Sequence, residues 1–129
     1  MKFSKLSNSG TKTVYEIEGV SPAYVNSIRR FGMDYVPTLA IEDVEIVANS
    51  SALYDEVVAH RLGLIPLTTD LKSYTLPEGE EISAMNSVQL SLNVDTPGYV
   101  YAKDLQSKDP KVVPVYDNIQ ITYLLEGQQ

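Results

Sequence analysis

SPAYVNSIRRFGMDYVP, residues 21–37, predicts an amphipathic helix with a defined start and end. Ser21 can accept hydrogen bonds from free helical N–H groups, and Pro22 suits the first helical position. Val36-Pro37 disfavours helical backbone, so we expect the helix to end near Asp34. Steps of four, three and four residues place one apolar stripe along the helix: Tyr24, Ile28, Phe31 and Tyr35.

The segments on both sides of this helix predict further elements. Residues 2–20 alternate with a period close to two around the turn cluster Asn8-Ser9-Gly10, which predicts a β-hairpin. Residues 38–48 predict a strand whose apolar phase breaks at Glu42-Asp43, where we expect a bulge. Residues 53–62 predict a short helix with acidic residues in its first turn and a basic residue in its last, as the helix dipole favours.

The C-terminal half of the chain predicts β-structure. Residues 88–94 (VQLSLNV) alternate cleanly between apolar and polar side chains, which predicts a strand over all of them. Asp95-Thr96-Pro97-Gly98 predicts a turn into a strand at 99–101. In a last strand, alternation predicts one shared face for three side chains: Ile119, Ile121 and Tyr123.

The composition excludes several classes of function. None of the 129 residues is cysteine, which excludes disulfides, thiolate metal sites and cysteine nucleophiles, and fits a cytosolic protein. His60 is the sole histidine, which excludes metal sites built on histidine clusters. A net charge of −7 argues against binding to nucleic-acid phosphates. No apolar run approaches the roughly 20 residues of a membrane span.

Two patterns carry candidate chemistry, each with a plainer alternative. Glu56 and His60, four residues apart, share a helix face and supply two metal ligands, but no third ligand stands at a recognisable spacing. The alternative is an exposed Glu–His pair. Tyr99, Tyr101 and Lys103 alternate like a strand that stacks bases, the alternative being tyrosines that simply face solvent. We expect no catalytic residue, cofactor or metal in this chain.

The arginines form a third pattern. The chain has three, Arg29, Arg30 and Arg61, and the first two lie beside the apolar helical stripe. Because the planar guanidinium binds carboxylates through two hydrogen bonds, an adjacent pair there predicts a docking edge for another protein. The alternative is a solvated helix flank.

Several blocks of the sequence resemble one family. VNSIRR (25–30) followed by VPTLAIEDVEI (36–46) resembles the signature of the alpha-type subunits of cellular RNA polymerases. NSSALYDEVVAHRLGLIPL (49–67) closely resembles the archaeal members of this family and their eukaryotic third-subunit counterparts. GYVYAKDL (98–105) and PVYDNI (114–119) also match the archaeal pattern, so the resemblance covers nearly the whole chain in one order.

The resemblance implies a non-catalytic assembly subunit of an archaeal DNA-directed RNA polymerase, located in the cytoplasm. The implied fold class is α+β, in which residues 1–49 supply the first half of a dimerisation domain and residues 50–129 belong to an inserted, mostly β domain. Such subunits pair with a smaller alpha-like subunit (subunit L in archaea) and dock the second-largest subunit. The alternative is a free-standing β-rich binding module that reuses this scaffold.

The resemblance also implies which residues make these contacts. The helix at 22–34 packs on the small alpha-like subunit through Tyr24, Ile28 and Phe31. No direct sequence-specific contact with nucleic acid and no membrane contact is implied. Docking of the second-largest subunit is implied for a larger set: Asn26, Arg29, Arg30, Asp55, Glu56, His60 and Arg61.

The sequence departs from this family at two points. Many members carry a cysteine-bearing metal or cluster site where this chain has Thr75-Leu76-Pro77-Glu78-Gly79-Glu80, so no metal ligand carries over. Members also continue past the segment at 126–129 with further strands, the return half of the dimerisation domain and a long helix. By resemblance, we expect the chain to be C-terminally incomplete and its apolar stripe to recruit another chain.

Overall fold

The computed structural model describes residues 1–77, 79 and 82–129. Glu78 and Glu80, in the segment where the resemblance raised a metal site, lie outside the described residues, as does Glu81. The chain divides into two compact units, Met1–Val36 and Pro37–Gln129. The domain boundary expected after residue 49 falls inside the second unit.

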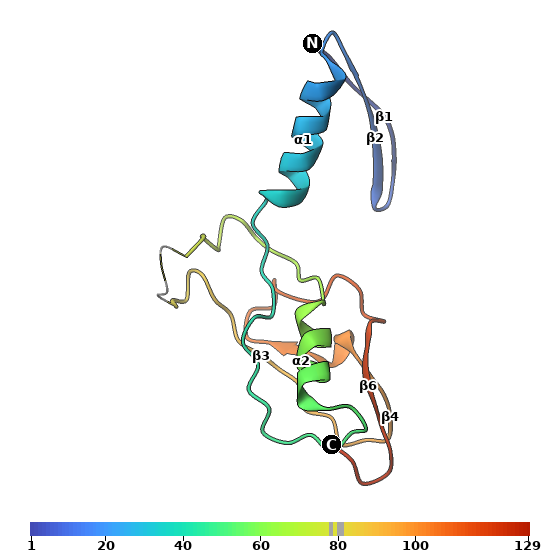
Figure 1. The fold of residues 1–129 in the computed structure, drawn as a ribbon, viewed down its shortest axis with the longest axis vertical. Helices are drawn as coiled ribbons and strands as arrows, with labels where there is room; N and C mark the ends of the chain where they lie inside the picture. The colour runs from blue at the N-terminus through green and yellow to red at the C-terminus, as the bar shows by residue number, and fades with distance from the viewer. Residues whose placement is uncertain (78, 80–81) are drawn as a thin grey trace. The chain divides into compact units, whose positions relative to one another are not determined.

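The first unit begins with the predicted hairpin. Strand β1 (Lys2–Ser9) pairs antiparallel with β2 (Lys12–Glu18), drawn in blue in Figure 1. Gly10 turns the chain between them with a φ of 54°, a left-handed conformation that glycine adopts without a steric penalty. The hairpin is therefore confirmed.

Helix α1 (Pro22–Asp34) has the predicted ends. The Ser21 hydroxyl caps its N-terminus by accepting a hydrogen bond from the Tyr24 N–H, at 3.4 Å. The Tyr35 N–H closes the last turn by donating to the Phe31 carbonyl, at 3.0 Å. No side chain among residues 1–36 is buried, so this unit has no apolar core of its own.

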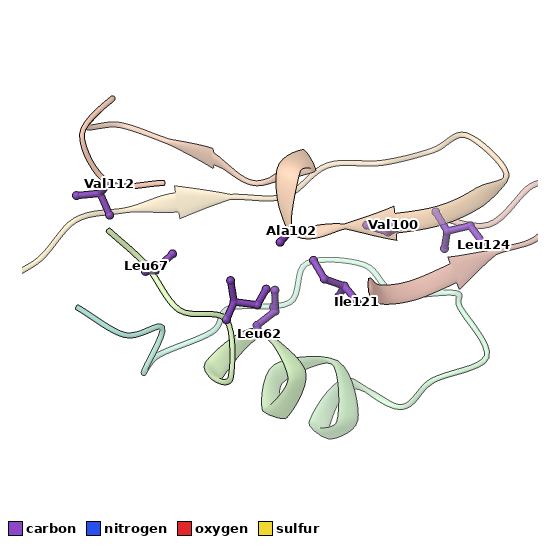
Figure 2. Close-up of a cluster of buried hydrophobic side chains, with 8 residues drawn as sticks. Leu62, Leu67, Val100, Ala102, Val112, Ile121 and Leu124 are labelled. Carbon is purple, nitrogen blue, oxygen red and sulfur yellow. The ribbon is translucent and has the colours of Figure 1, made fainter. Parts of the chain in front are cut away.

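The second unit is built around an apolar core. Helix α2 (Asp55–Gly63) packs on strand β6 (Gln120–Leu124), which pairs antiparallel with β4 (Gly98–Tyr101). In Figure 2, Leu62 of α2 points toward Ile121 and Ala102. The buried hydrophobic side chains come from segments far apart in sequence: Leu62, Ile65, Leu67, Val100, Ala102, Val112, Ile121 and Leu124.

Strand β6 carries one residue more than β4. Val100 pairs with Thr122 and Tyr101 pairs with Gln120, so Ile121 has no residue opposite it. This bulge lets the consecutive residues Ile121 and Thr122 both be buried. The strict alternation predicted for this strand is therefore wrong, because Tyr123 is exposed while Leu124 is buried.

The strand predicted over 88–94 is much shorter in the structure. Only Leu90–Ser91 (β3) pairs, antiparallel to Gln106–Ser107 (β5), which follows the 3-10 turn η1 (Ala102–Asp104). The predicted alternation still describes burial, because Val88, Leu90, Leu92 and Val94 pack against the core and the residues between them are exposed. Alternation of apolar and polar residues indicates which side of the segment is buried. Pairing by backbone hydrogen bonds also requires a neighbouring strand in register.

The strand predicted over 38–48 is absent, although all these residues are described. The segment runs without regular structure, and its Leu39, Ile41 and Val44 side chains pack against the core. The predicted break in phase at Glu42-Asp43 is present in the burial pattern. Within the described part of the chain, no helix is long and apolar enough to cross a membrane.

Candidate functional site

The apolar stripe of α1 is an exposed candidate surface. Its side chains retain from 48% (Ile28) to 73% (Tyr35) of their accessible surface. The rings of Phe31 and Tyr35 lie 4.9 Å apart and so form the C-terminal end of a continuous apolar strip. Because burial of such side chains is favourable, the stripe is suited to contact an apolar surface of another chain.

The polar residues of α1 form a second stripe on the side of the helix away from Ile28. Asn26 Oδ1 accepts hydrogen bonds from Nε and Nη2 of Arg29, at 3.1 and 3.0 Å. Arg29 Nη1 also lies 3.0 Å from Met33 Sδ. The Arg30 side chain makes no hydrogen bond or ion pair with the described residues. In the predicted Arg pair, the Arg29 guanidinium is thus held by hydrogen bonds and the Arg30 guanidinium has no partner among the described residues.

The loop that leads into α2 is organised by Asn49. Its Nδ2 donates to Asp55 Oδ1 at 2.7 Å and to the Leu53 carbonyl at 2.9 Å. Its Oδ1 accepts from the N–H and the hydroxyl of Ser51, at 3.0 and 2.8 Å. Asp55 therefore has a fixed position at the start of α2, although its side chain is exposed. This role of Asn49 was not predicted from the sequence.

Of the other α2 candidates, Glu56 and His60 are exposed, whereas Arg61 is half-buried. Arg61 Nη1 donates a 2.8 Å hydrogen bond to the carbonyl of Ile121 in β6. Arg61 therefore faces the sheet, while Glu56 and His60, at 100° steps along the helix, share another side. Glu56 and His60 therefore lie on the same side of α2, and Arg61 lies on a different side.

A hollow of about 470 Å³ lies beside His60, between α2 and residues 41–44. At its edge Gly63 approaches residue 41 closely, since a Cβ there would lie 3.3 Å from the Ile41 carbonyl oxygen. The lining is largely apolar, and its ionisable members are Glu42 and His60. Of the α2 candidates, His60 alone lines this open hollow.

Among the described residues, no third ligand lies near Glu56 and His60 to complete a metal site. In the described structure no ion pair joins these two side chains, and no group of three or more His, Cys, Asp or Glu residues is placed to hold a metal ion.

A polar network elsewhere in the second unit joins residues 70–74 to residues 109–113. The Tyr74 hydroxyl donates to Asp109 Oδ2 at 2.6 Å, which lowers the pKa of Asp109 and raises that of Tyr74. Lys111 Nζ lies 3.1 Å from Asp70 Oδ2. The pKa of Asp70 is lowered, chiefly by a hydrogen bond from the Lys72 N–H and then by those from Ser73 and Lys111.

The outer face of the β4–β6 pair gathers aromatic side chains. Tyr99 and Tyr123 are cross-strand partners whose rings meet edge to face at 4.9 Å, and Tyr101 lies 6.0 Å from Tyr99. Lys103 Nζ lies 5.5 Å from the centre of the Tyr101 ring. Tyr99, Tyr101 and Lys103 were predicted from the sequence to share this face, whereas Tyr123 was not, because the bulge at Ile121 leaves no signal in the alternation.

The described elements define an α+β protein, as predicted, with exposed surfaces suited to binding other proteins. The sequence model of the family described as the RNA polymerase Rpb3/RpoA insert domain matches residues 41–129. The chain therefore belongs to this family.

Archaeal relatives named DNA-directed RNA polymerase subunit Rpo3 match most of the chain. The Methanosphaera stadtmanae protein is 44% identical over 126 residues, covering 92% of this chain and 47% of that protein. The Methanobrevibacter smithii protein is 40% identical and covers 100% and 48%. The Pyrococcus furiosus protein is 44% identical and covers 89% and 43%. The chain spans about half the length of these relatives.

Proposed function

We propose that the chain acts as a non-catalytic assembly subunit of an archaeal DNA-directed RNA polymerase, in the cytoplasm. In this role it pairs with the small alpha-like subunit (subunit L) and docks the second-largest subunit. The observation that carries the proposal is the exposed stripe of Tyr24, Ile28 and Phe31 on a unit without a buried side chain, in a chain of this family.

The stripe has the chemistry that pairing requires. Tyr24, Ile28 and Phe31 are each about half exposed, so covering them removes apolar surface from water and stabilises a complex by roughly 1 kcal/mol for each side chain. The polar stripe on the other side of α1 stays accessible when these residues are covered. Two different partners therefore fit on one helix.

Docking of the second-largest subunit is proposed for two groups of residues, one in each unit. Asn26, Arg29 and Arg30 supply donors on α1, and Arg29 is held by Asn26 in an orientation that presents its guanidinium. Asp55, Glu56 and His60 supply exposed polar groups on α2. Arg61 supports the second group by binding β6, and Arg29 and Arg30 suit carboxylates on the partner.

We also propose that residues 1–49 belong to a dimerisation domain and residues 50–129 to a domain inserted in it. The Ser50 N–H donates to the Gln129 carbonyl at 2.9 Å, and the Gln129 N–H donates to the Ser50 hydroxyl at 2.9 Å. These bonds join residues 50 and 129, which supports treating residues 50–129 as one folded segment.

A free-standing β-rich binding module is the second candidate, because the unit Pro37–Gln129 contains every buried hydrophobic side chain of the described structure. Affinity capture of the tagged chain from archaeal cells, followed by mass spectrometry, separates the two. If the chain is a polymerase subunit, we expect capture of the small alpha-like and large catalytic subunits in one salt-resistant complex. Capture without any polymerase subunit would contradict it and favour the module.

A further inference from the structure

We propose that the outer face of the β4–β6 pair, formed by Tyr99, Tyr101 and Tyr123, is a docking surface for an arginine-bearing segment of a partner protein. This surface lies outside every contact proposed above, so its failure would leave the assembly function standing. The alternation of the strands builds it: Val100, Thr122 and Leu124 point into the core, and the tyrosines between them point outward.

The three rings form one platform. Tyr99 and Tyr123 retain 56% and 45% of their accessible surface, and their rings meet edge to face at 4.9 Å. The platform already binds one cation within the chain, because Lys103 Nζ lies 5.5 Å from the Tyr101 ring centre. The rings of Tyr99 and Tyr123 make no such contact with the described residues and are free for a cation from outside.

Charge favours a basic occupant. The chain carries a net charge of −7, which attracts a cationic partner and repels a polyanion. Gly98 pairs with Leu124, so the segments before β4 and after β6 emerge at the same end of the pair. Both segments carry an exposed acid there, Asp95 and Glu126. These acids add negative charge at the end of the pair where Tyr99 and Tyr123 lie next to Gly98 and Leu124.

The preferred cation is a guanidinium rather than an ammonium. Its planar, weakly hydrated surface stacks on aromatic faces, while its edge still donates hydrogen bonds to carboxylates. Arginine and tyrosine are also the residue types enriched at protein interfaces. Single-stranded nucleic acid, the other ligand that stacks on such rings, needs basic residues along its backbone, and Lys103 is the single one in the platform.

The test is a titration of the full chain with a blocked Gly-Gly-Arg-Gly-Gly peptide. Binding is measured from the changes in the NMR chemical shifts of β4 and β6. The matched peptide with citrulline in place of arginine keeps the shape and removes the charge, so we expect its binding to be lost. Tyr99→Leu with Tyr123→Leu keeps the net charge and should weaken arginine-peptide binding about tenfold. Tyr99→Phe with Tyr123→Phe keeps the ring faces and should retain binding within about twofold.

Tyr54→Leu removes an exposed tyrosine elsewhere and should leave binding unchanged. Equal binding of the arginine and citrulline peptides, or an equal loss with the Phe and Leu pairs, would overturn the proposal. Tighter binding of oligouridylate than of the arginine peptide on the same residues would overturn the choice of a protein partner. Should the double Leu variant not fold, the comparison of the two peptides on the unaltered chain decides.

Discussion

Arg61 Nη1 donates a 2.8 Å hydrogen bond to the carbonyl oxygen of Ile121 and so joins α2 to β6. Ile121 is the bulge residue, which has no partner residue in β4. Since buried backbone carbonyls need a partner, Arg61 satisfies a group that the irregular strand leaves open. Arg61, to which the family resemblance assigns a docking role, therefore also stabilises the packing of α2 on β6.

We predict that Arg61→Ala lowers the free energy of unfolding of the second unit by about 1.5–3 kcal/mol, the value of a hydrogen bond to a charged group. Urea denaturation and hydrogen exchange of the β6 amides measure it. Arg29→Ala, which removes a guanidinium bonded only within α1, should change stability by less than about 0.5 kcal/mol. Equal effects of the two substitutions would show that the Arg61–Ile121 bond contributes nothing.

A second prediction concerns Thr122, whose Oγ1 is buried and has no hydrogen-bond partner among the described residues. Thr122→Val replaces this hydroxyl with a methyl group of similar shape. We expect the free energy of unfolding to rise by about 1 kcal/mol, because a desolvated, unpaired polar group is removed. Thr96→Val, at an exposed turn residue, is the matched control. A less stable Thr122→Val chain would mean that the hydroxyl is paired in solution.

How far the sequence predicts this structure depends on whether the information is local. The cap at Ser21 and the turn at Gly10 are local, and both were predicted. The ladder of β3 was overestimated, because pairing depends on the neighbour Gln106–Ser107, whose sequence carries no strand signal.

The same distinction between local and non-local information applies to the candidate site. The stripe on α1 was predicted from helical spacing and is present as an exposed surface. The outward direction of Tyr123 was not predicted, because it depends on the bulge at Ile121, a feature of pairing with a distant strand. The inward direction of Arg61 was not predicted either, because it depends on how α2 packs on β6.

A third prediction concerns pH and the Tyr74–Asp109 bond. The pKa of Asp109 is lowered from 3.8, so its contribution to stability is complete above that pH and is lost as pH falls through the lowered value. The pKa of Tyr74 is raised from 10.0, so its contribution is present below that pH and is lost as pH rises through the raised value.

Tyr74→Phe should therefore flatten the loss of stability at both extremes of pH while lowering stability at neutral pH. Thermal unfolding across the pH range measures this, with Tyr116→Phe as a control at an exposed tyrosine, whereas Tyr74 is half-buried. If Tyr74→Phe showed the acid and alkaline transitions of the unaltered chain, the hydrogen bond would not be their origin.

A fourth prediction separates the two stripes of α1. Arg29→Ala with Arg30→Ala should leave pairing with the small alpha-like subunit intact within about twofold, yet weaken recruitment of the second-largest subunit at least about tenfold. Stepwise reconstitution measures both. Lys5→Ala with Lys12→Ala removes the same charge from the hairpin and should affect neither step. Equal losses at both steps would argue against separate contact surfaces.

The pairing surface itself is tested most directly by coexpression with the small alpha-like subunit and sedimentation of the product. Ile28→Asp with Phe31→Asp places two charges in the proposed apolar contact, and we predict that no heterodimer forms, because burying unpaired charges costs several kcal/mol. Asn26→Asp with Met33→Asp adds the same charge on the other side of α1 and should leave the heterodimer intact. A heterodimer that survives the Ile28 and Phe31 substitutions would contradict the account.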